Sequence, residues 1–306
     1  MSCYFYNRKT NSFYGDSKYT DALLQVMWHI TNACRLDCKF CFSKSLRTDR
    51  SELTTHQIEN TIGLLMHLGV RKIDLSGGEP LLSPHLAFIS KCCNDSGIVP
   101  TITTSGFGTE PNITWIENNY EQFSRIIISL DGPEIVHNSL RGNCQAYEKF
   151  LEFYERMSRK KCDRIRINTV VSRPVLSCVK DLCLMINKMA PVEWCCIQPH
   201  PINKVDGFDI YSTTQTEFED FVAECRSNLK SASISLLTRN NVDYSSYWVL
   251  YSNQHICHLT VGNQFDEDYI LTPGNIFSIR EAVKKYPQLY VKPITNSYTA
   301  EADLLD

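Results

Sequence analysis

Three cysteines lie within eight residues of one another, at Cys34, Cys38 and Cys41. Their C-x3-C-x2-C spacing places three thiols on one short loop, and three thiolates can hold three irons of a four-iron, four-sulfur cluster. A fully coordinated cluster usually takes four cysteines, and no fourth cysteine follows nearby. The spacing therefore favours a cluster that has one iron open to a ligand from outside the protein.

The same cysteines allow a second interpretation, a zinc site completed by a distant cysteine or histidine. Structural zinc usually joins two C-x2-C arms, and the sequence has no second C-x2-C. Most of the other eleven cysteines are scattered through apolar stretches, which is typical of buried thiols that pack as small hydrophobic groups. The pattern favours the cluster and leaves zinc as the alternative.

The composition excludes several classes of protein. A chain of 306 residues, 43% of them hydrophobic, can bury a sizeable core in one large domain with or without an appendage. A net charge of −3 gives no overall attraction to nucleic acid or to membranes. The sequence has no run of about 18 apolar residues and no apolar signal segment. We therefore expect a cytoplasmic protein whose partners include neither nucleic acid nor a membrane.

The elements that must position the cysteines alternate between β-rich runs and helical patterns. Six runs rich in Val, Ile and Thr predict strands buried on both faces, at 25–31, 72–76, 100–104, 125–130, 164–170 and 193–198. Helical patterns lie between them, at 55–68, 84–93, 113–123, 146–159 and 179–189. Repeated strand–helix units predict a parallel sheet with right-handed crossovers. We therefore expect an α/β fold, a partial (βα)6 TIM-like barrel with a C-terminal extension.

Beyond residue 200 the pattern loosens. We expect helices at 216–229 and near 277–285, and two strands that pair, at 247–250 and 254–259. This divides the chain into an N-terminal extension, a barrel, and a C-terminal extension that closes the active site, at 1–24, 25–200 and 201–306. Ligands bind at the carboxyl ends of the strands in such folds. The cysteine loop follows the first predicted strand directly, so we expect the site at that edge.

Short or polar residues lie at the ends of the next three predicted strands or just after them. They are Gly77, Gly78, Glu79, Ser105, Ser129 and Asp131. The two glycines lack a side chain, so the backbone there can approach a ligand closely. Residues of these types also form ordinary turns, which is the alternative for each of them.

The fifth predicted strand carries two arginines. Arg164, Arg166 and Asn168 alternate along it and therefore share one face. If that face points into the barrel, the buried arginines need an anionic partner. The strand thus predicts a small substrate that carries phosphate or carboxylate, while Arg164 at an exposed strand end is the alternative for that residue.

Phe40 stands directly before the last cysteine, and together with the cysteine spacing it resembles the signature of the radical SAM superfamily. Gly77-Gly78-Glu79 is similar to the GGE motif of that superfamily. The resemblance implies two cofactors, a [4Fe-4S] cluster and S-adenosylmethionine (SAM), which binds the open iron. Reductive cleavage of SAM would give a 5′-deoxyadenosyl radical, with the electron from a donor such as flavodoxin or ferredoxin.

The same resemblance implies roles for individual residues. Phe40 would stack near the adenine, and Glu79 would oppose the amino group of SAM. Arg141 would pair with the SAM carboxylate through its guanidinium. The other implied cofactor contacts are Gly77, Gly78, Ser105, Ser129, Asp131, Asn168 and Gln198.

A narrower resemblance covers residues 166–259, which are similar to viperin and its prokaryotic relatives. It is carried by Arg166-Ile-Asn-Thr-Val-Val-Ser-Arg173 and by Ser246-Tyr247-Trp-Val-Leu250. The resemblance implies dehydration of a ribonucleoside triphosphate to a 3′-deoxy-3′,4′-didehydro nucleotide. Tyr247 would supply a hydrogen late in that reaction. Arg166 stands where the family has a lysine that contacts the triphosphate, which keeps the charge but changes the geometry.

Other substrates stay open. The segment from Ser129 to Gly142 is more similar to peptide-modifying and other radical SAM enzymes. A peptide, a sugar or a sugar nucleotide from natural-product biosynthesis is therefore the alternative substrate. A non-enzymatic regulator that keeps the fold is a further alternative, and the three cysteines, Glu79 and Asn168 speak against it.

Overall fold

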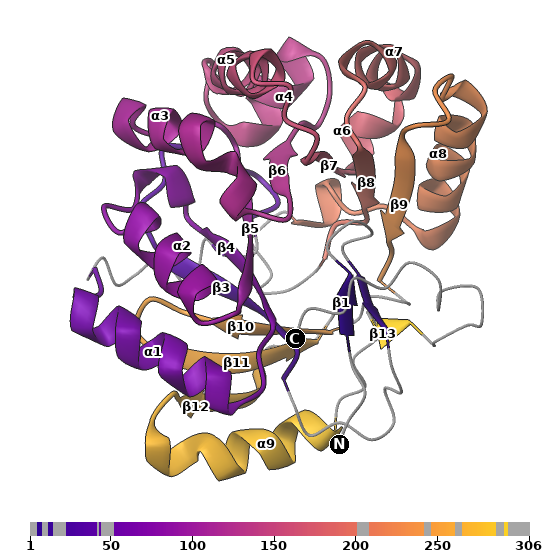
Figure 1. Cartoon of the computed structure of the whole chain (residues 1–306). Coiled ribbons are helices and arrows are strands. Elements are labelled where there is room, and N and C mark those ends of the chain that lie inside the picture. Colours follow the sequence, from indigo (N-terminus) through magenta and orange to yellow (C-terminus); the bar gives the residue numbers. More distant parts are fainter. Residues whose placement is uncertain are drawn as a thin grey trace.

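The computed structural model describes residues 5–7, 12–14, 23–41, 43, 52–200, 208–241, 246–260, 265–285 and 291–292. Within these residues, ten strands form one sheet in the order β12-β11-β10-β3-β4-β5-β6-β7-β8-β9. Figure 1 shows that the sheet is curved and that helices cover its outer face. The predicted α/β fold, a partial TIM-like barrel, is confirmed.

The six predicted strands lie side by side in this sheet and run parallel to one another. They are β3 (Gln25–Thr31), β4 (Lys72–Gly77), β5 (Val99–Thr104), β6 (Ile126–Ser129), β7 (Ile165–Val170) and β8 (Glu193–Ile197). All four residues of β6 are buried, as expected for β-branched residues in a strand covered on both faces. The parallel arrangement brings the carboxyl ends of all six strands to one edge of the sheet.

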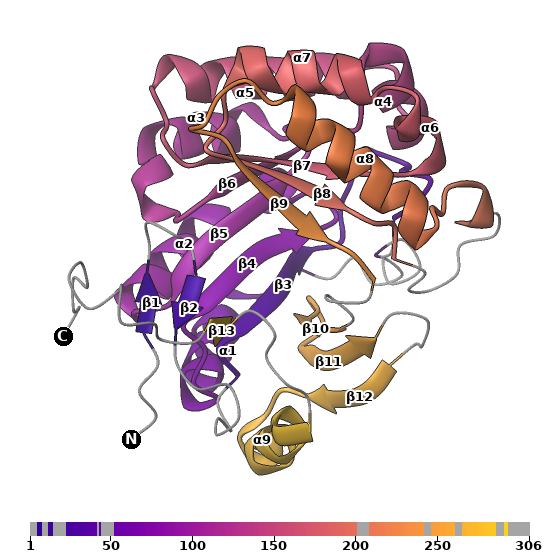
Figure 2. The ribbon, with the colours of Figure 1, turned by 90° about the vertical axis from the view of Figure 1, so that its right-hand side faces the viewer.

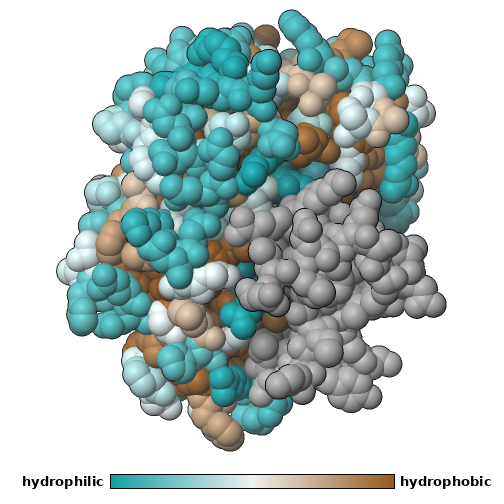
Figure 3. All heavy atoms as spheres, in the orientation of Figure 1, coloured by the Kyte–Doolittle hydropathy of each residue, from teal (hydrophilic) through white to brown (hydrophobic). Residues whose placement is uncertain are grey.

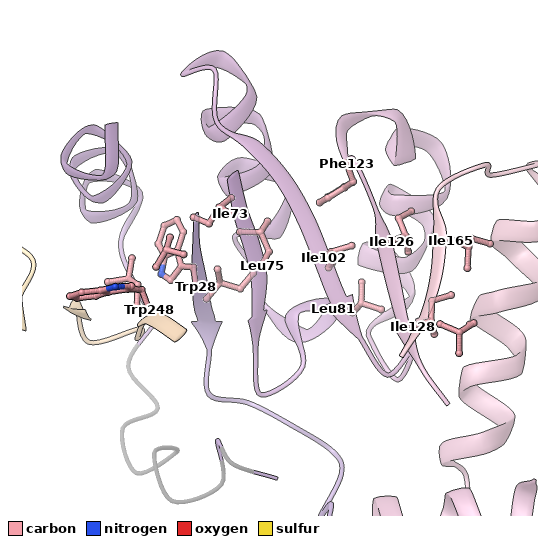
Figure 4. Packing of buried hydrophobic residues seen from close by; sticks show 14 of the residues in the cluster. Trp28, Ile73, Leu75, Leu81, Ile102, Phe123, Ile126, Ile128, Ile165 and Trp248 are labelled. Carbon is pink, nitrogen blue, oxygen red and sulfur yellow. The ribbon is translucent and has the colours of Figure 1, made fainter. Parts of the chain in front are cut away.

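A continuous apolar layer lies between the sheet and the helices. Figure 4 shows side chains of neighbouring strands in this layer, among them Ile73, Leu75, Ile102, Ile126 and Ile165. Full burial of such a side chain is worth about 1.5–3 kcal/mol. A shift of register by one residue would turn these side chains to the opposite face of the sheet. The layer therefore fixes which residues stand at the strand ends.

Five helices lie close to their predicted ranges. They are α1 (Thr55–His67), α2 (Leu86–Asp95), α3 (Glu110–Asn119), α5 (Ala146–Arg159) and α7 (Val179–Met189). A capping box starts α1, because the Thr54 side chain accepts a hydrogen bond from the Gln57 N–H at 3.3 Å and the Thr54 N–H donates to the Gln57 side chain. Figure 3 shows hydrophilic side chains over most of the helices at the top of the view, so their apolar faces are directed inward.

Two helices were not predicted from the sequence. These are α4 (Glu134–Arg141) and α6 (Arg173–Leu176). The first is eight residues long and follows Asp131-Gly132-Pro133, a good turn sequence, so its short helical pattern does not stand out. The helix ends at Arg141, and Gly142 caps it in the left-handed conformation.

The sheet continues past residue 200. Helix α8 (Gln215–Asn228) leads to β9 (Ser235–Arg239), a further parallel strand beside β8 that the sequence did not predict. Its side chains are half-buried or exposed, so it lacks the apolar run of the other strands. The chain then returns to the other edge of the sheet, where β10 (Ser246–Leu250) pairs in parallel with β3.

Strand β10 starts an antiparallel set. It pairs with β11 (His255–Thr260) as predicted, and β11 pairs with β12 (Phe265–Ile270). Figure 2 shows α9 (Ile276–Lys285) beside β12. A separate three-stranded sheet joins β1 (Phe5–Asn7), β2 (Ser12–Tyr14) and β13 (Val291–Lys292). Short 3-10 turns lie at Pro80–Leu82, Tyr120–Gln122, Phe208–Ile210 and Pro273–Asn275. Among the described helices, none combines the length and apolar character needed to cross a membrane.

Candidate iron–sulfur and SAM site

The cysteine loop follows β3 directly, at the carboxyl edge of the parallel strands. Cys34 and Cys41 are half-buried, whereas Cys38 is only 7% exposed. The Cys34 sulfur accepts a hydrogen bond from the Leu36 N–H at 3.4 Å. Burial raises the pKa of the Cys38 thiol to about 12, although the nearby Arg141 acts in the opposite direction. A bound metal ion or cluster would favour the thiolate form of Cys38, which is the form that ligates metals.

The donor set fits an iron–sulfur cluster better than it fits one ion. A single zinc ion takes four ligands around one point. In the part of the chain that the structure describes, no three His, Cys, Asp or Glu side chains are grouped closely enough to hold one ion. A four-iron cluster offers a separate iron to each thiolate, so its cysteines need not converge in that way. Apolar side chains of Leu36, Phe107 and Ala146 pack against the cysteines and form an apolar wall on one side of them.

The end of α4 holds the cysteine loop by its backbone. The N–H groups of Asp37 and Lys39 donate to the carbonyl oxygens of Arg141 and Leu140, at 3.0 and 2.9 Å. The last carbonyls of a helix have no partner within the helix, so the loop satisfies them. Gly142 follows with φ of +64°, and a Cβ there would lie 2.5 Å from the Asp37 carbonyl oxygen. Only glycine fits this close approach.

A buried ion pair stands behind the loop. Nε and Nη2 of Arg141 both lie 2.6 Å from Oδ2 of Asp131, and Asp131 Oδ1 accepts a hydrogen bond from the Val170 N–H at 2.9 Å. Arg141 Nη1 donates to the Cys38 sulfur at 3.8 Å. The guanidinium carbon also lies 5.4 Å from the centre of the Phe40 ring. Asp131, predicted as a SAM contact, is thus joined to Arg141 and, through it, to the central cysteine.

His137 belongs to the same group, although no role was predicted for it from the sequence. Its Nδ1 accepts a hydrogen bond from the Asp131 N–H at 3.1 Å, which makes Nε2 the protonated nitrogen of the neutral ring. Burial, together with the charge of Arg141, lowers the pKa of His137 well below its usual value. The ring is therefore neutral and holds the Asp131 backbone. Its place six residues after Asp131, on a short helix, was the only available signal.

Glu79 is buried among hydrogen-bond donors. Its carboxylate accepts from the Thr104 hydroxyl, from both the N–H and the hydroxyl of Ser105, and from the Leu81 N–H, at distances of 2.5 to 3.1 Å. Glu79 is 2% exposed. The structure thus places two predicted SAM contacts, Glu79 and Ser105, together and bonded to each other, between the ends of β4 and β5.

The glycines before Glu79 have a neighbour within the chain itself. A Cβ on Gly77 would lie 2.3 Å from the Thr31 carbonyl oxygen, and one on Gly78 would lie 2.1 Å from that of Ala33. The Glu79 N–H also donates to the Ala33 carbonyl at 2.7 Å. The backbone at these glycines therefore approaches the start of the cysteine loop closely, whereas the expected approach to a ligand stays a prediction.

Three further predicted contacts lie at strand ends. Ser129 pairs in register with Asn168, whose Oδ1 is buried without a hydrogen-bond partner in the described structure. Both polar atoms of the Gln198 side-chain amide are hydrogen-bonded within the chain. Its Nε2 donates to the Thr213 carbonyl at 3.0 Å, and its Oε1 accepts from the Asn241 N–H at 2.9 Å. Asn168 therefore keeps an acceptor for a ligand, whereas the Gln198 amide is already engaged.

The buried Arg166 has an anionic partner, as the sequence predicted, but the partner is a protein carboxylate. Its Nε donates to Glu193 Oε2 at 2.5 Å, and Arg125 Nη2 donates to the other oxygen at 2.8 Å. Lys72 lies in the same buried group, where burial and then the charge of Arg166 lower its pKa to about 7. Register between β7 and β8 places Arg166 opposite Glu193, which the sequence alone does not show.

Two predicted substrate-side residues, Arg164 and Tyr247, are not brought to the site by any contact that the structure describes. Arg164 comes before β7, at the opposite end of the strand from the cysteine loop, and its Nη1 donates to the carbonyl oxygens of Glu121 and Phe123, both at 2.7 Å. These hydrogen bonds give the Arg164 guanidinium partners within the protein, so its position does not require a bound ligand. The backbone of Tyr247 belongs to β10, and its side chain lies outside the described part of the structure.

Residues 28–176 match the family model of the Radical SAM superfamily. They form a radical SAM domain, and the chain is a radical SAM enzyme. Its cofactors are SAM and the [4Fe-4S] cluster characteristic of the family.

Similar proteins differ in what they act on. The chain is 26% identical over 267 residues to an S-adenosylmethionine-dependent nucleotide dehydratase of Flammeovirga pacifica, which covers 81% of this chain and 87% of that protein. It is 31% identical over 157 residues to an AdoMet-dependent heme synthase of Methanosarcina barkeri, which covers 50% of this chain and 44% of that protein. The structure of Streptococcus suis SuiB bound to precursor peptide SuiA is similar in fold, with a TM-score of 0.64 at 15% identity. That match covers 78% of this chain and 60% of SuiB.

Proposed function

We propose that this enzyme dehydrates a ribonucleoside triphosphate to a 3′-deoxy-3′,4′-didehydro nucleotide, as viperin-like enzymes do. The observation that carries the proposal is the extent of the similarity to the nucleotide dehydratase, which reaches over 87% of that protein. The match to the heme synthase covers only 44% of the relative. A similarity confined to half of a relative supports a shared domain, whereas one that extends over most of both chains also supports a shared substrate class.

The protein's part in this reaction is to hold and orient the reactants. Cys34, Cys38 and Cys41 would hold the cluster, which when bound would supply the electron that cleaves SAM to methionine and a 5′-deoxyadenosyl radical. An external donor such as flavodoxin or ferredoxin provides that electron. Around the loop, the SAM contacts we propose are Phe40, Gly77, Gly78, Glu79, Ser105, Ser129 and Asn168. The other three contacts predicted from the sequence, Asp131, Arg141 and Gln198, have their polar side-chain atoms engaged within the chain in this structure. The chain aims one C–H bond of the substrate at the radical and excludes other hydrogen donors.

An anionic substrate is supported by the charges inside the barrel. Arg125 and Arg166 share the single carboxylate of Glu193, so the three groups together carry a net positive charge. A positive potential in a low-dielectric interior favours an anion such as a triphosphate. Arg166 can meet that anion only if it shares its guanidinium with Glu193, which makes its contact different from that of a free lysine.

The C-terminal residues 201–306 close the site in this proposal. Strand β10 pairs directly with β3, the strand that leads into the cysteine loop. Just after β3, the Asn32 side chain donates to the Ser252 hydroxyl at 3.0 Å. These contacts support a substrate side built from the C-terminal strands, with Tyr247 on β10 as the proposed hydrogen donor.

The test is to incubate the anaerobically reconstituted, reduced enzyme with SAM and each ribonucleoside triphosphate in turn, and to measure 5′-deoxyadenosine. We expect one triphosphate to stimulate its formation well above the rate without substrate, and the dehydrated nucleotide to appear in equal amount. Stimulation by none of them would remove the nucleotide from the account. A peptide or a sugar nucleotide would then take its place, in keeping with the sequence from Ser129 to Gly142.

A further inference from the structure

We propose that Arg141 is a positioning residue that sets the reduction potential of the cluster through Cys38, and that Asp131 and His137 hold it in place. The proposal rests on the radical SAM class of the enzyme and is independent of the nucleotide substrate. It differs from a role of Arg141 in binding the SAM carboxylate, and the two can be separated by experiment.

The guanidinium of Arg141 is fixed in one orientation. Two of its nitrogens lie 2.6 Å from Asp131 Oδ2, and the third donates to the Cys38 sulfur. Because the guanidinium is planar, it cannot turn away from Cys38 without losing its contacts to Asp131. Arg141 is 8% exposed and Asp131 is fully buried, so little water competes for these bonds.

Asp131 is itself held from two sides. Its second carboxylate oxygen accepts from the Val170 N–H at the end of β7, and its own N–H donates to His137 Nδ1. The strand end and α4 therefore both determine where the carboxylate lies. A chain of hydrogen bonds thus runs from the rigid sheet, through Asp131 and Arg141, to the sulfur of the central cysteine.

The side chain of Arg141 is separate from the contacts that dock the loop. Docking uses the backbone carbonyls of Leu140 and Arg141, which accept from Lys39 and Asp37. A change of the Arg141 side chain leaves those backbone bonds in place. The backbone carbonyls thus hold the loop, whereas the Arg141 side chain makes the electrostatic contact to the Cys38 sulfur.

That contact affects the electron that enters the cluster. One-electron reduction by an external donor adds a negative charge to the cluster, and no bond of the protein forms or breaks. A buried positive charge that donates a hydrogen bond to a ligating sulfur stabilises the reduced form more than the oxidised form. Arg141 should therefore raise the reduction potential, which makes the cluster easier to reduce.

The experiment compares variants of the reconstituted full-length enzyme by iron content and by a redox titration followed by electron paramagnetic resonance. The first variant combines Asp131→Asn with Arg141→Gln, which removes both charges and leaves no buried charge without a partner. The second is Arg141→Lys, which keeps the charge but not the planar fork. The control is Asn143→Ala, since Asn143 donates to the Arg35 carbonyl of the same loop at 3.2 Å without a contact to sulfur.

We expect full iron loading in all of them. The reduction potential of the double variant should be more negative than that of the wild type by at least about 59 mV. For one electron, this shift corresponds to a tenfold change in the ratio of oxidised to reduced cluster. Arg141→Lys should fall between it and the wild type, and Asn143→Ala should match the wild type. An unchanged potential in the double variant, with the Kd for SAM weakened tenfold, would overturn the proposal in favour of a SAM contact. Failure of both Arg141 variants to hold iron would overturn it too, because the pair would then serve assembly.

Discussion

Nε and Nη2 of Arg141 both lie 2.6 Å from Oδ2 of Asp131, and both residues are buried behind the cysteine loop. The two residues are ten apart in sequence, at the end of α4 and after the end of β6. This ion pair joins the rigid sheet to the loop that carries the cluster. Its removal should therefore affect both the stability of the protein and its cofactor.

Asp131→Ala should destabilise the protein strongly. It leaves the buried Arg141 without its carboxylate, and loss of one partner of a buried pair costs about 3–5 kcal/mol. Urea unfolding of the cluster-free protein measures the change. Asp163→Ala is the matched control, because Asp163 is an aspartate with a mostly exposed side chain that lies 3.5 Å from Arg164. Equal stability of Asp131→Ala and the wild type would contradict the structural role of the pair.

Gly142→Ala and Gly63→Ala should change stability in opposite directions. Gly142 has φ of +64° and no room for a Cβ, so alanine costs about 1–2 kcal/mol for the backbone alone and also pushes against Asp37. Gly63 lies inside α1 with nothing within 4 Å of an added Cβ, so alanine should gain up to about 1 kcal/mol there. Iron content after reconstitution should fall only in Gly142→Ala. Equal behaviour of the two variants would show that α4 does not hold the loop in this way.

Lys72 should make stability depend on pH. Its pKa in the folded protein is lowered to about 7, by burial and then by Arg166 and Arg239, with Asp74 and Glu193 acting in the opposite direction. Between that pH and the ordinary value of 10.5, the unfolded chain binds a proton that the folded chain does not, so stability rises with pH. The slope contributed by this one group is at most about 1.4 kcal/mol per pH unit.

Lys72→Met should remove that slope. Urea unfolding of wild type and variant at pH 7.5 and at pH 8.5 isolates the contribution of Lys72, because the other titrating groups are common to both proteins. Both pH values lie within the range, between about 7 and 10.5, over which this contribution accumulates. The difference in stability between wild type and variant should change in favour of the wild type at the higher pH. Parallel pH profiles of the two proteins would mean that Lys72 titrates normally.

The parallel strands could be predicted because burial on both faces leaves a plain apolar signature. The run Ile126–Ser129 is such a case, and its strand, β6, was predicted along with its five parallel neighbours. Strand β9 was missed for the converse reason, since Ser235–Arg239 is half-buried or exposed and alternates weakly. The short helix α4 was missed because eight residues behind an Asp-Gly-Pro turn carry too little periodicity to be distinguished from the turn.

Residues that could do chemistry were found more readily than their partners. Cys38, Asp131 and Arg141 were singled out by residue type and position. Asp131 and Arg141 were each predicted to contact SAM, and the ion pair between them was not predicted. The pairing depends on how α4 folds back over the strand end, which no local pattern encodes. In the same way, Arg166 was expected to be buried beside an anion, and the carboxylate of Glu193 was found only through the register of β7 and β8.

The most direct test of the account is the iron content and SAM cleavage of Cys38→Ala, set beside Cys144→Ala, which removes an exposed cysteine outside the loop. After anaerobic reconstitution, the wild type and Cys144→Ala should hold about four irons per chain and form 5′-deoxyadenosine once reduced. Cys38→Ala should lose the cluster and form none. A Cys38→Ala protein that still produced 5′-deoxyadenosine at the wild-type rate would contradict the cluster site on which the whole account rests.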